Sequence, residues 1–477
     1  MSKSWWTYLV TGVAVFMAAM DNLVVTNALP VIRTDLGTGL EGLEWTVNAY
    51  TLTFAVFLLT AAVLGDRVGR RRLFAAGLAV FTAASAVAAL APDIGVLVAA
   101  RAVQGLGGAV VLPLSLTLLV GVVPPARRGR ALGAWGAMSG LGVALGPVVG
   151  GAVTEYASWQ WIFWINVPVG LVLLPLTALV RDSRGRPGRL DPLGTALVTA
   201  GLFGIVYGLV RGNGHGWTSG SVLAGLVGGG VLLLAFVAWQ ARTDAPMMPL
   251  SMFASRGFSL ATAVGLLMSF GMFGTVFLLA QFMQGVQHLS PLAAGVRTLP
   301  WTAMPAITAP VAGILTDRIG GRRIVALGLA LQAAGVGWLA AITSPDLPYP
   351  HMIGPFVLAG AGMGLFFAPS TRLVLAFVPA PLEGVASGTA NAVRQFGTVL
   401  GIAVLGAIFS ARGGYATAQQ FVDGVVPAAA VGAVVLAAGA VVALAIPRTT
   451  PSPAGAPAPL GAEDRHNFRE VVASTGG

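Results

Sequence analysis

Almost the whole sequence of 477 residues is divided into stretches of about 20 mostly apolar residues, the length that an α-helix needs to cross a bilayer core. Hydrophobic residues make up 56% of the chain and charged residues only 9%. Soluble domains contain about 25% charged residues, so no soluble fold could bury this much apolar surface. The sequence therefore predicts an all-α polytopic membrane protein. Fourteen spans are expected near residues 7–29, 45–65, 73–91, 95–120, 131–153, 162–180, 191–210, 219–240, 258–282, 294–316, 324–343, 352–378, 385–409 and 425–446.

The basic residues are concentrated between the apolar stretches. There are 27 of them, and only Lys3 is a lysine. If the N-terminus lies in the cytoplasm, 20 of the 27 fall in cytoplasmic segments, as the positive-inside rule requires. This distribution predicts that both termini are cytoplasmic. We expect the membrane to be the plasma membrane of a bacterium. It also accounts for the net charge of +10 without a nucleic-acid partner.

Several chemistries are excluded by what the sequence lacks. It contains no cysteine, so it has no disulfide and no thiolate metal ligand. A Walker A loop needs a Gly-Lys-Ser/Thr step, which the single lysine near the N-terminus does not form. No HExxH or similar metal spacing occurs. We expect no cofactor, no metal site and no enzymatic activity.

The chain contains an internal repeat. LGDRVGRRR around Asp66 recurs as LTDRIGGRR around Asp317, 251 residues later (317 − 66). Duplicated halves are typical of transporters that work by alternating access. The expected domains are an N-terminal six-helix half (1–185), two inserted helices (186–245), a C-terminal six-helix half (246–447) and a disordered cytoplasmic tail (448–477). We expect the inserted helices to lie at the periphery of the two halves.

Two charges interrupt the apolar spans of the N-terminal half. Asp21 is the only formal charge between Trp6 and Pro30, and Arg101 lies inside the fourth span. A charge at the centre of a spanning helix costs about 2.5–3.5 kcal/mol on insertion scales, so such residues usually handle protons, ions or substrate. The competing interpretations are a carboxyl group that only binds a neighbouring helix and an arginine that reaches back to the surface. Gln104, one turn from Arg101, favours a functional site.

Several ordered motifs resemble the major facilitator superfamily, and within it the fourteen-helix drug:proton antiporter branch. They are MDNLVVTNALP at 20–30, AVLGDRVGRRR at 62–72, RAVQGLGGAVVLP at 101–113, GAMSGLGVALGPVVGG at 136–151, WQWIFWINVPVG at 159–170 and NAVRQFGTVLG at 391–401. Ala62 departs from the glycine that usually opens the loop motif, whereas Gly313 keeps it in the second copy. The resemblance implies the major facilitator fold, with two six-helix halves plus two extra helices.

The resemblance also implies roles for particular residues, which we give here as expectations. Proton and substrate coupling falls to Asp21, Arg101, Gln104, Asn391 and Arg394; an inner gate loop that locks the two halves together contains Asp66, Arg67, Gly69, Arg70, Asp317 and Arg318; and a pliant antiporter helix contains Gly140, Gly146, Pro147 and Gly150. For the loop, the alternative is that its arginines only fix the topology. For Asp21→Asn, we expect loss of proton-coupled export with folding intact.

The sequence thus predicts a proton-coupled efflux antiporter that exports organic, lipophilic and often cationic compounds such as drugs or antibiotics. The partners would be a small-molecule substrate, protons and the lipid bilayer, and we expect a monomer. Alternatives are a dedicated exporter of one metabolite or self-made antibiotic, an uptake symporter, and a membrane-embedded enzyme.

Overall fold

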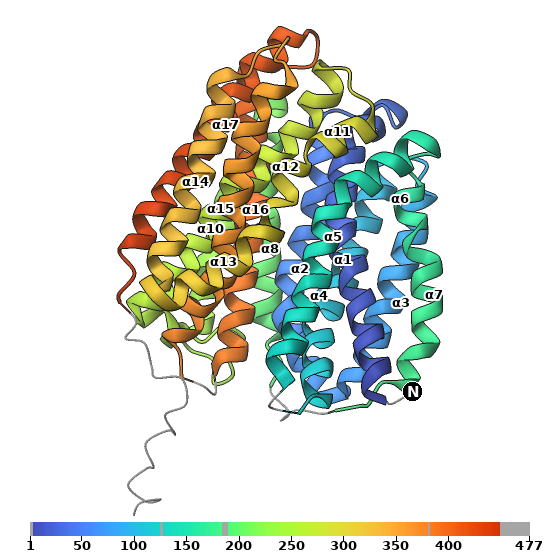
Figure 1. Ribbon diagram of the computed structural model, residues 1–477, viewed down its shortest axis with the longest axis vertical. Coiled ribbons are helices and arrows are strands. Elements are labelled where there is room, and N and C mark those ends of the chain that lie inside the picture. Colours follow the sequence, from blue (N-terminus) through green and yellow to red (C-terminus); the bar gives the residue numbers. More distant parts are fainter. Residues whose placement is uncertain (1–2, 125–126, 184–188, 380–381, 449–477) are drawn as a thin grey trace, which may run out of the picture. The chain divides into compact units, whose positions relative to one another are not determined.

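The computed structural model describes residues 3–124, 127–183, 189–379 and 382–448. Fourteen helices in these ranges are long and apolar enough to cross a membrane, as predicted (Figure 1). The first five spans are α1 (Lys3–Asp35), α2 (Leu40–Val68), α3 (Arg70–Ala89), α4 (Ile94–Val122) and α5 (Arg128–Tyr156). The sixth span consists of α6 (Trp161–Trp164), α7 (Asn166–Leu176) and η2 (Thr177–Leu179), and the seventh is α8 (Pro192–His215).

The remaining seven spans complete the bundle. They are α9 (Gly220–Gln240), α10 with η4 (Arg256–Gln281, Phe282–Val286), α12–α13 (Leu299–Thr302, Met304–Ile319), α14 (Gly321–Ile342), α15 (Tyr349–Ala376), α16 (Glu383–Arg412) and α17 (Ala418–Leu444). Two short helices, η3 (Leu250–Ala254) and α11 (Pro291–Arg297), lie in connections.

The span expected near 294–316 is broken into pieces. Pro300 and Pro305 lie at the first positions of α12 and α13, just after the ends of α11 and α12. Proline has no backbone N–H to continue the preceding helix and its ring is tolerated only in the first turn of the next one. The chain therefore changes helix twice between Pro291 and Met304.

The two copies of the repeated loop share their backbone geometry. Gly69 ends α2 with φ +110°, and Gly320 ends α13 with φ +87°. Each donates its N–H to a carbonyl four residues earlier, at Gly65 and Thr316. Positive φ is accessible to glycine without a Cβ clash, so both turns need glycine at this point. We call the end of the bundle that holds these turns and the start of α1 the N-terminal face, and the other end the opposite face.

Residues 1–447 form one compact unit, so the helices of the two predicted halves pack as a continuous body. The largest contacts are α1 with α5, α2 with α4, α10 with α16, and α14 with α15. The division at 185 and 245 stays a prediction. The predicted disordered tail, 448–477, lies outside the described residues except for Arg448.

The inserted helices are not a simple appendage. α8 packs against both α2 and α16 (Figure 1), and one apolar cluster joins Leu52 of α2, Val206 of α8 and Val399 of α16. α9 packs on the outer side of α8. α8 therefore covers the line where the N-terminal and C-terminal groups of helices meet.

Asp191 fastens α8 to α9 at the N-terminal face. Its carboxylate accepts the N–H of Gly194 at 2.8 Å, and also accepts from Trp239 Nε1 at 2.8 Å and from Gln240 Nε2 at 2.5 Å. Burial acts to raise the pKa of Asp191, but these hydrogen bonds outweigh it and hold that pKa below its usual value.

Candidate functional site

The intramembrane aspartate and arginine predicted from the sequence meet in a buried ion pair. Asp21 lies on α1 and Arg101 lies two turns into α4, and their side chains are each 1% exposed. Arg101 Nη1 is 2.5 Å from Asp21 Oδ2. Arg101 therefore does not reach back to the surface, which was the competing interpretation for this residue.

Two side-chain amides donate to the other oxygen of the carboxylate, and a serine hydroxyl accepts from these amides. Gln104 Nε2 and Asn166 Nδ2 each donate to Asp21 Oδ1 at 2.9 Å. Gln104 also donates to Ser85 Oγ at 2.8 Å and accepts from Arg101 Nη1 at 2.6 Å. We call Asp21, Ser85, Arg101, Gln104 and Asn166 the Asp21 network. It joins α1, α3, α4 and α7, so movement of α1 must act on all of them.

The arginine has two further contacts on α2. Arg101 Nε donates to the backbone oxygen of Thr46 at 3.3 Å, and its Cζ lies 4.2 Å from the ring centroid of Tyr50. A guanidinium stays charged at any physiological pH. Removing one member of a buried ion pair leaves the other uncompensated, at a cost of about 3–5 kcal/mol. The packing around Arg101 therefore depends on the Asp21 carboxylate.

The carboxylate is sealed in this conformation. Asp21 is 1% exposed, and every polar contact it makes is with protein side chains of the Asp21 network. In this conformation the cation that pairs with Asp21 is Arg101. A role for Asp21 in coupling stays a prediction, with access depending on rearrangement of the pair.

Sequence reasoning missed four members of this site: Thr46, Tyr50, Ser85 and Asn166. Each is a polar residue inside an apolar span, and all four are buried. That pattern was available as a signal, but polar uncharged residues are common in membrane helices. Only the packing of α2 and α3 against α4, and of α7 against α1 and α3, singles them out.

The predicted pair in the second half is separate from the Asp21 network. Arg394 Nη2 donates to Asn391 Oδ1 at 2.6 Å, one turn away on α16, and the guanidinium lies 5.2 Å from the Phe367 ring. Among the described residues no carboxylate lies within ion-pair distance of Arg394. The five predicted coupling residues thus fall into two groups.

At the opposite face, helices of the N-terminal and C-terminal parts of the chain contact each other. Asn27 of α1 donates through Nδ2 to the backbone oxygens of Pro147 on α5 and Pro291 on α11, both at 3.0 Å. Gln284 of η4 donates to the backbone oxygen of Asn27 at 2.7 Å. Asn27 lies six residues beyond Asp21 on the same helix. We call this set of contacts the Asn27 closure.

The glycines of α5 divide into two kinds. A Cβ on Gly146 or Gly150 would lie 2.9 Å and 3.0 Å from the Leu23 Cβ and the Val24 Cα of α1. A Cβ on Gly140 would meet nothing within 4 Å. Gly140 therefore lies outside the packed seam to which the sequence assigned it, and close approach of α1 and α5 begins only beyond it.

The halves of α5 and α13 nearest the N-terminal face are uncovered. Residues 132–141 of α5 are exposed or half-buried on every side of the helix. The same is true of every residue of α13 except Ala312. A helix that only faced lipid would bury its inner side. These helix halves therefore stand apart from the opposite group of helices at this end, while the Asn27 closure holds them at the other.

The predicted inner gate loops do not meet. Arg70 Nε binds Asp66 Oδ1 at 2.7 Å within the α2–α3 turn, and Gly69 forms that turn. Arg70 also donates its backbone N–H to Ser183 in the same group of helices, and Arg67 is exposed. The lock between halves that the resemblance implies for this loop is not formed in this conformation.

The second loop behaves similarly. Asp317 binds Arg372 of α15 at 2.8 Å, with side chains 72% and 59% exposed, and Arg318 is exposed. An ion pair this exposed contributes about 0–1 kcal/mol. The absence of a connection between the two loops agrees with the separation of α5 and α13 at this face.

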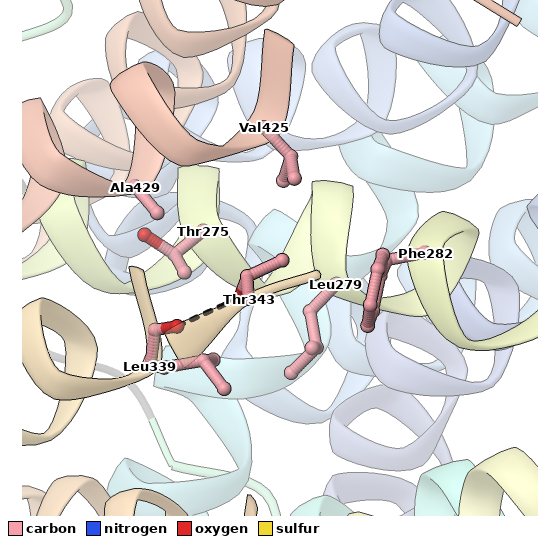
Figure 2. Close-up of a pocket in the computed structure, with 7 residues that line it drawn as sticks. All are labelled: Thr275, Leu279, Phe282, Leu339, Thr343, Val425 and Ala429. Atoms are coloured by element: carbon pink, nitrogen blue, oxygen red, sulfur yellow. Dashed lines mark hydrogen bonds between the residues drawn. The ribbon is translucent and has the colours of Figure 1, made fainter. Parts of the chain in front are cut away.

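A cavity in the C-terminal group is too small for cargo. It measures about 20 Å³ and lies between α10, η4, α14 and α17, lined by Thr275, Leu279, Phe282, Leu339, Thr343, Val425 and Ala429 (Figure 2). Both threonine hydroxyls already donate within their own helices, to Gly271 and Leu339. A volume of this size holds about one water, so this is a packing void.

Fourteen spanning helices with a buried ion pair among them, and with α5 and α13 apart at the N-terminal face, are typical of a membrane transporter. The chain belongs to the Major Facilitator Superfamily, whose family model matches residues 11–296 and 261–473.

Its relatives include export and resistance proteins. The chain is 35% identical to the tetracenomycin C resistance and export protein of Streptomyces glaucescens, over 86% of this chain and 77% of that protein. It is 36% identical to the multidrug resistance protein Stp of Mycobacterium tuberculosis (strain CDC 1551 / Oshkosh), over 85% and 76%. It is 39% identical to the cephamycin export protein CmcT of Amycolatopsis lactamdurans, over 82% of each.

Solved structures share the fold. A bacterial homolog of the human lysosomal transporter Spinster matches with a TM-score of 0.67 and 17% identity, over 94% of this chain and 99% of that one. The peptide transporter POT matches with a TM-score of 0.67 and 16% identity, over 93% and 96%. At this identity the likeness concerns the fold alone.

Proposed function

We propose that this protein exports organic compounds from a bacterial cell in exchange for protons. The compounds would be lipophilic and often cationic, such as drugs or antibiotics. The buried Asp21–Arg101 pair carries the proposal, because a proton on the Asp21 carboxylate would remove its attraction for Arg101 and so change the packing of α1. The names of the relatives, which include export and multidrug resistance proteins, support the direction of transport.

The arrangement of the two faces supports entry of cargo from one side of the membrane. The arginine distribution favours a cytoplasmic N-terminal face, in a plasma membrane. The described conformation then has its uncovered helix halves toward the cytoplasm and the Asn27 closure toward the outside. Cargo would enter from the cytoplasm between α5 and α13 and leave after the closure opens, with the chain acting as a monomer.

Coupling would run along α1. A proton on Asp21 removes the charge that compensates Arg101, and the uncompensated guanidinium destabilises the described packing by about 3–5 kcal/mol. Asp21 and Asn27 are six residues apart on one helix, so a shift of α1 that relieves Arg101 also moves Asn27 against α5 and α11. A proton gradient with a membrane voltage supplies about 2.3 kcal/mol per charge for each 100 mV, which is of the size required.

A dedicated exporter of one metabolite is the second candidate. The names of two relatives each specify a single compound, tetracenomycin C and cephamycin. The two candidates share the coupling mechanism and differ in the breadth of cargo.

The test is a panel of antibiotics and dyes in an efflux-deficient bacterial host. We expect raised resistance or reduced accumulation for several compounds, abolished by a protonophore and by loss of Asp21. A phenotype for one compound only would favour the dedicated exporter. Export that continues in the presence of the protonophore would refute proton coupling, and uptake of every active compound would refute the direction.

A further inference from the structure

A second carboxyl group inside the bundle is not used by the Asp21 network. Glu44 lies on α2, four residues after its start at Leu40, and is therefore about 6 Å along the helix from the opposite face. The residue is 2% exposed. Its Oε1 has no hydrogen-bond partner among the described residues.

Of the charged groups near this end of α2, Glu41 is paired, whereas Arg33 has no ion pair and its Nε has no hydrogen-bond partner among the described residues. Glu41 on the same helix binds Arg211 Nε of α8 at 2.7 Å. Arg33 of α1 places its Cζ 3.5 Å from the ring centroid of Tyr415, which lies between α16 and α17. No ion pair among the described residues involves Glu44.

The titratable neighbours are close enough to act on one another. Burial raises the pKa of the Tyr415 hydroxyl; Arg33 opposes that rise and Glu44 adds to it. The Tyr415 hydroxyl is bonded to Gln281 of α10, and Tyr207 of α8 is bonded to Arg211. Glu44 therefore lies near the Tyr415 phenol without forming a hydrogen bond to it.

The carboxyl group packs on the other group of helices. A Cβ built on Gly406 of α16 would overlap Glu44 Oε1. A larger residue at this position would force the carboxyl group to move, so α2 and α16 are packed directly over it near the opposite face. A carboxylate buried without a partner is far more costly than the neutral acid.

We propose that Glu44 is a proton-binding site distinct from Asp21, occupied while α2 and α16 are packed at the opposite face and emptied when they separate there. The ligand is a proton exchanged with the solution at that face, because the carboxyl group lies about one turn from it. This proton gates the closure and is not carried across the membrane. The proposal rests on the alternating access of the proposed function.

The sign of the pH effect follows from linkage. The packed state binds the proton more tightly than the separated state, since only the packed state excludes water from the carboxyl group. Lowering the pH at the opposite face therefore favours the packed state. For one proton, the ratio of packed to separated molecules changes by up to about tenfold per pH unit.

Spin labels at the opposite face measure this ratio. The chain has no cysteine, so Gly39→Cys at the start of α2 and Ser410→Cys near the end of α16 can be labelled without removing native thiols. Both positions are exposed. Distances would be measured by electron paramagnetic resonance in purified, reconstituted protein between pH 5 and pH 8. We expect the shorter distance to gain population as the pH falls.

Variants separate Glu44 from Asp21. Glu44→Gln copies the neutral acid in shape, so it should fold and hold the shorter distance at every pH. Gly406→Ala should favour the longer distance, because its methyl group displaces the carboxyl group. Asp21→Asn should shift the ratio at every pH and should show a steeper gain of the shorter distance as the pH falls, because a proton on Asp21 opposes the packed state.

A gain of the shorter distance with falling pH that survives in Glu44→Gln, or that is absent in Asp21→Asn, would overturn the proposal. Failure of Glu44→Gln to fold would also overturn it, because the neutral form would then not be the packed one. Loss of the response in Asp21→Asn alone would assign the gating proton to Asp21. Export by the unlabelled protein tests the proposed function separately.

Discussion

Asp21→Asn tests the ion pair most directly, because all the groups that point at this carboxylate are donors. Arg101 Nη1 donates to one oxygen, and Gln104 and Asn166 donate to the other. An asparagine must turn its own NH₂ toward one of these sides, so either orientation sets two donors against each other. The sequence alone suggested that folding would be intact; the structure revises this expectation.

The magnitude follows from the burial of the pair. Both side chains are 1% exposed, and breaking such a pair costs about 3–5 kcal/mol. Asp21→Asn combined with Arg101→Gln removes both charges and should cost less than the two single changes summed, with a coupling of about 0.5–3 kcal/mol. Asp317→Asn, in the exposed ion pair, is the matched control and should cost no more than about 1 kcal/mol.

Two measurements check this prediction. Thermal unfolding in detergent can be followed through the 11 tryptophans, and proton-driven export can be followed in proteoliposomes. We expect Asp21→Asn to melt at a lower temperature and to lose proton-driven accumulation. Wild-type stability with wild-type transport would refute the reasoning, as would a double variant whose loss equals the sum of the single losses.

Three further predictions concern the packing of the helices. Gly150→Ala should destabilise the protein by about 1–3 kcal/mol because its Cβ meets the backbone of α1, whereas Gly140→Ala, which meets open space, should be neutral or stabilising; equal melting temperatures would contradict this. Asn27→Ala should loosen the opposite face, seen as faster labelling of a cysteine introduced there, and an unchanged rate would rule out a closing role. Asp191 has a lowered pKa in the folded protein, so its stabilising effect is complete above its unfolded pKa of about 3.9 and is lost as the pH falls through the folded value. Asp191→Asn should therefore flatten the acid limb of a melting-temperature profile, and a profile parallel to that of the wild-type protein would exclude this account.

The sequence determined the class of fold because a bilayer leaves few choices. A span of apolar residues in lipid must satisfy its backbone internally, which a helix does. All fourteen spans expected from hydropathy are present in the described ranges. The proline breaks before α12 and α13 could also have been anticipated, since proline lacks the N–H that a continuing helix requires.

The sequence also marked both members of the ion pair. A charge inside an apolar span is conspicuous in one dimension, and Gln104 follows Arg101 at a helical spacing. It could not show that Asp21 and Arg101 pair with each other, because their separation along the chain says nothing about how α1 lies against α4. Ser85 and Asn166 were passed over because they come from yet other helices.

Only the tertiary structure decided which face is closed and which charges lack partners. Gly140 and Gly150 are equivalent in sequence, yet one lies in open space and the other against α1. Asp66 and Asp317 occupy equivalent loops, yet each pairs within its own group of helices. Glu44 precedes an apolar span in the sequence, and only the packing of α16 over it makes it a buried acid without a partner. Composition and periodicity act along one chain segment at a time, whereas burial and ion pairing depend on which helices come together.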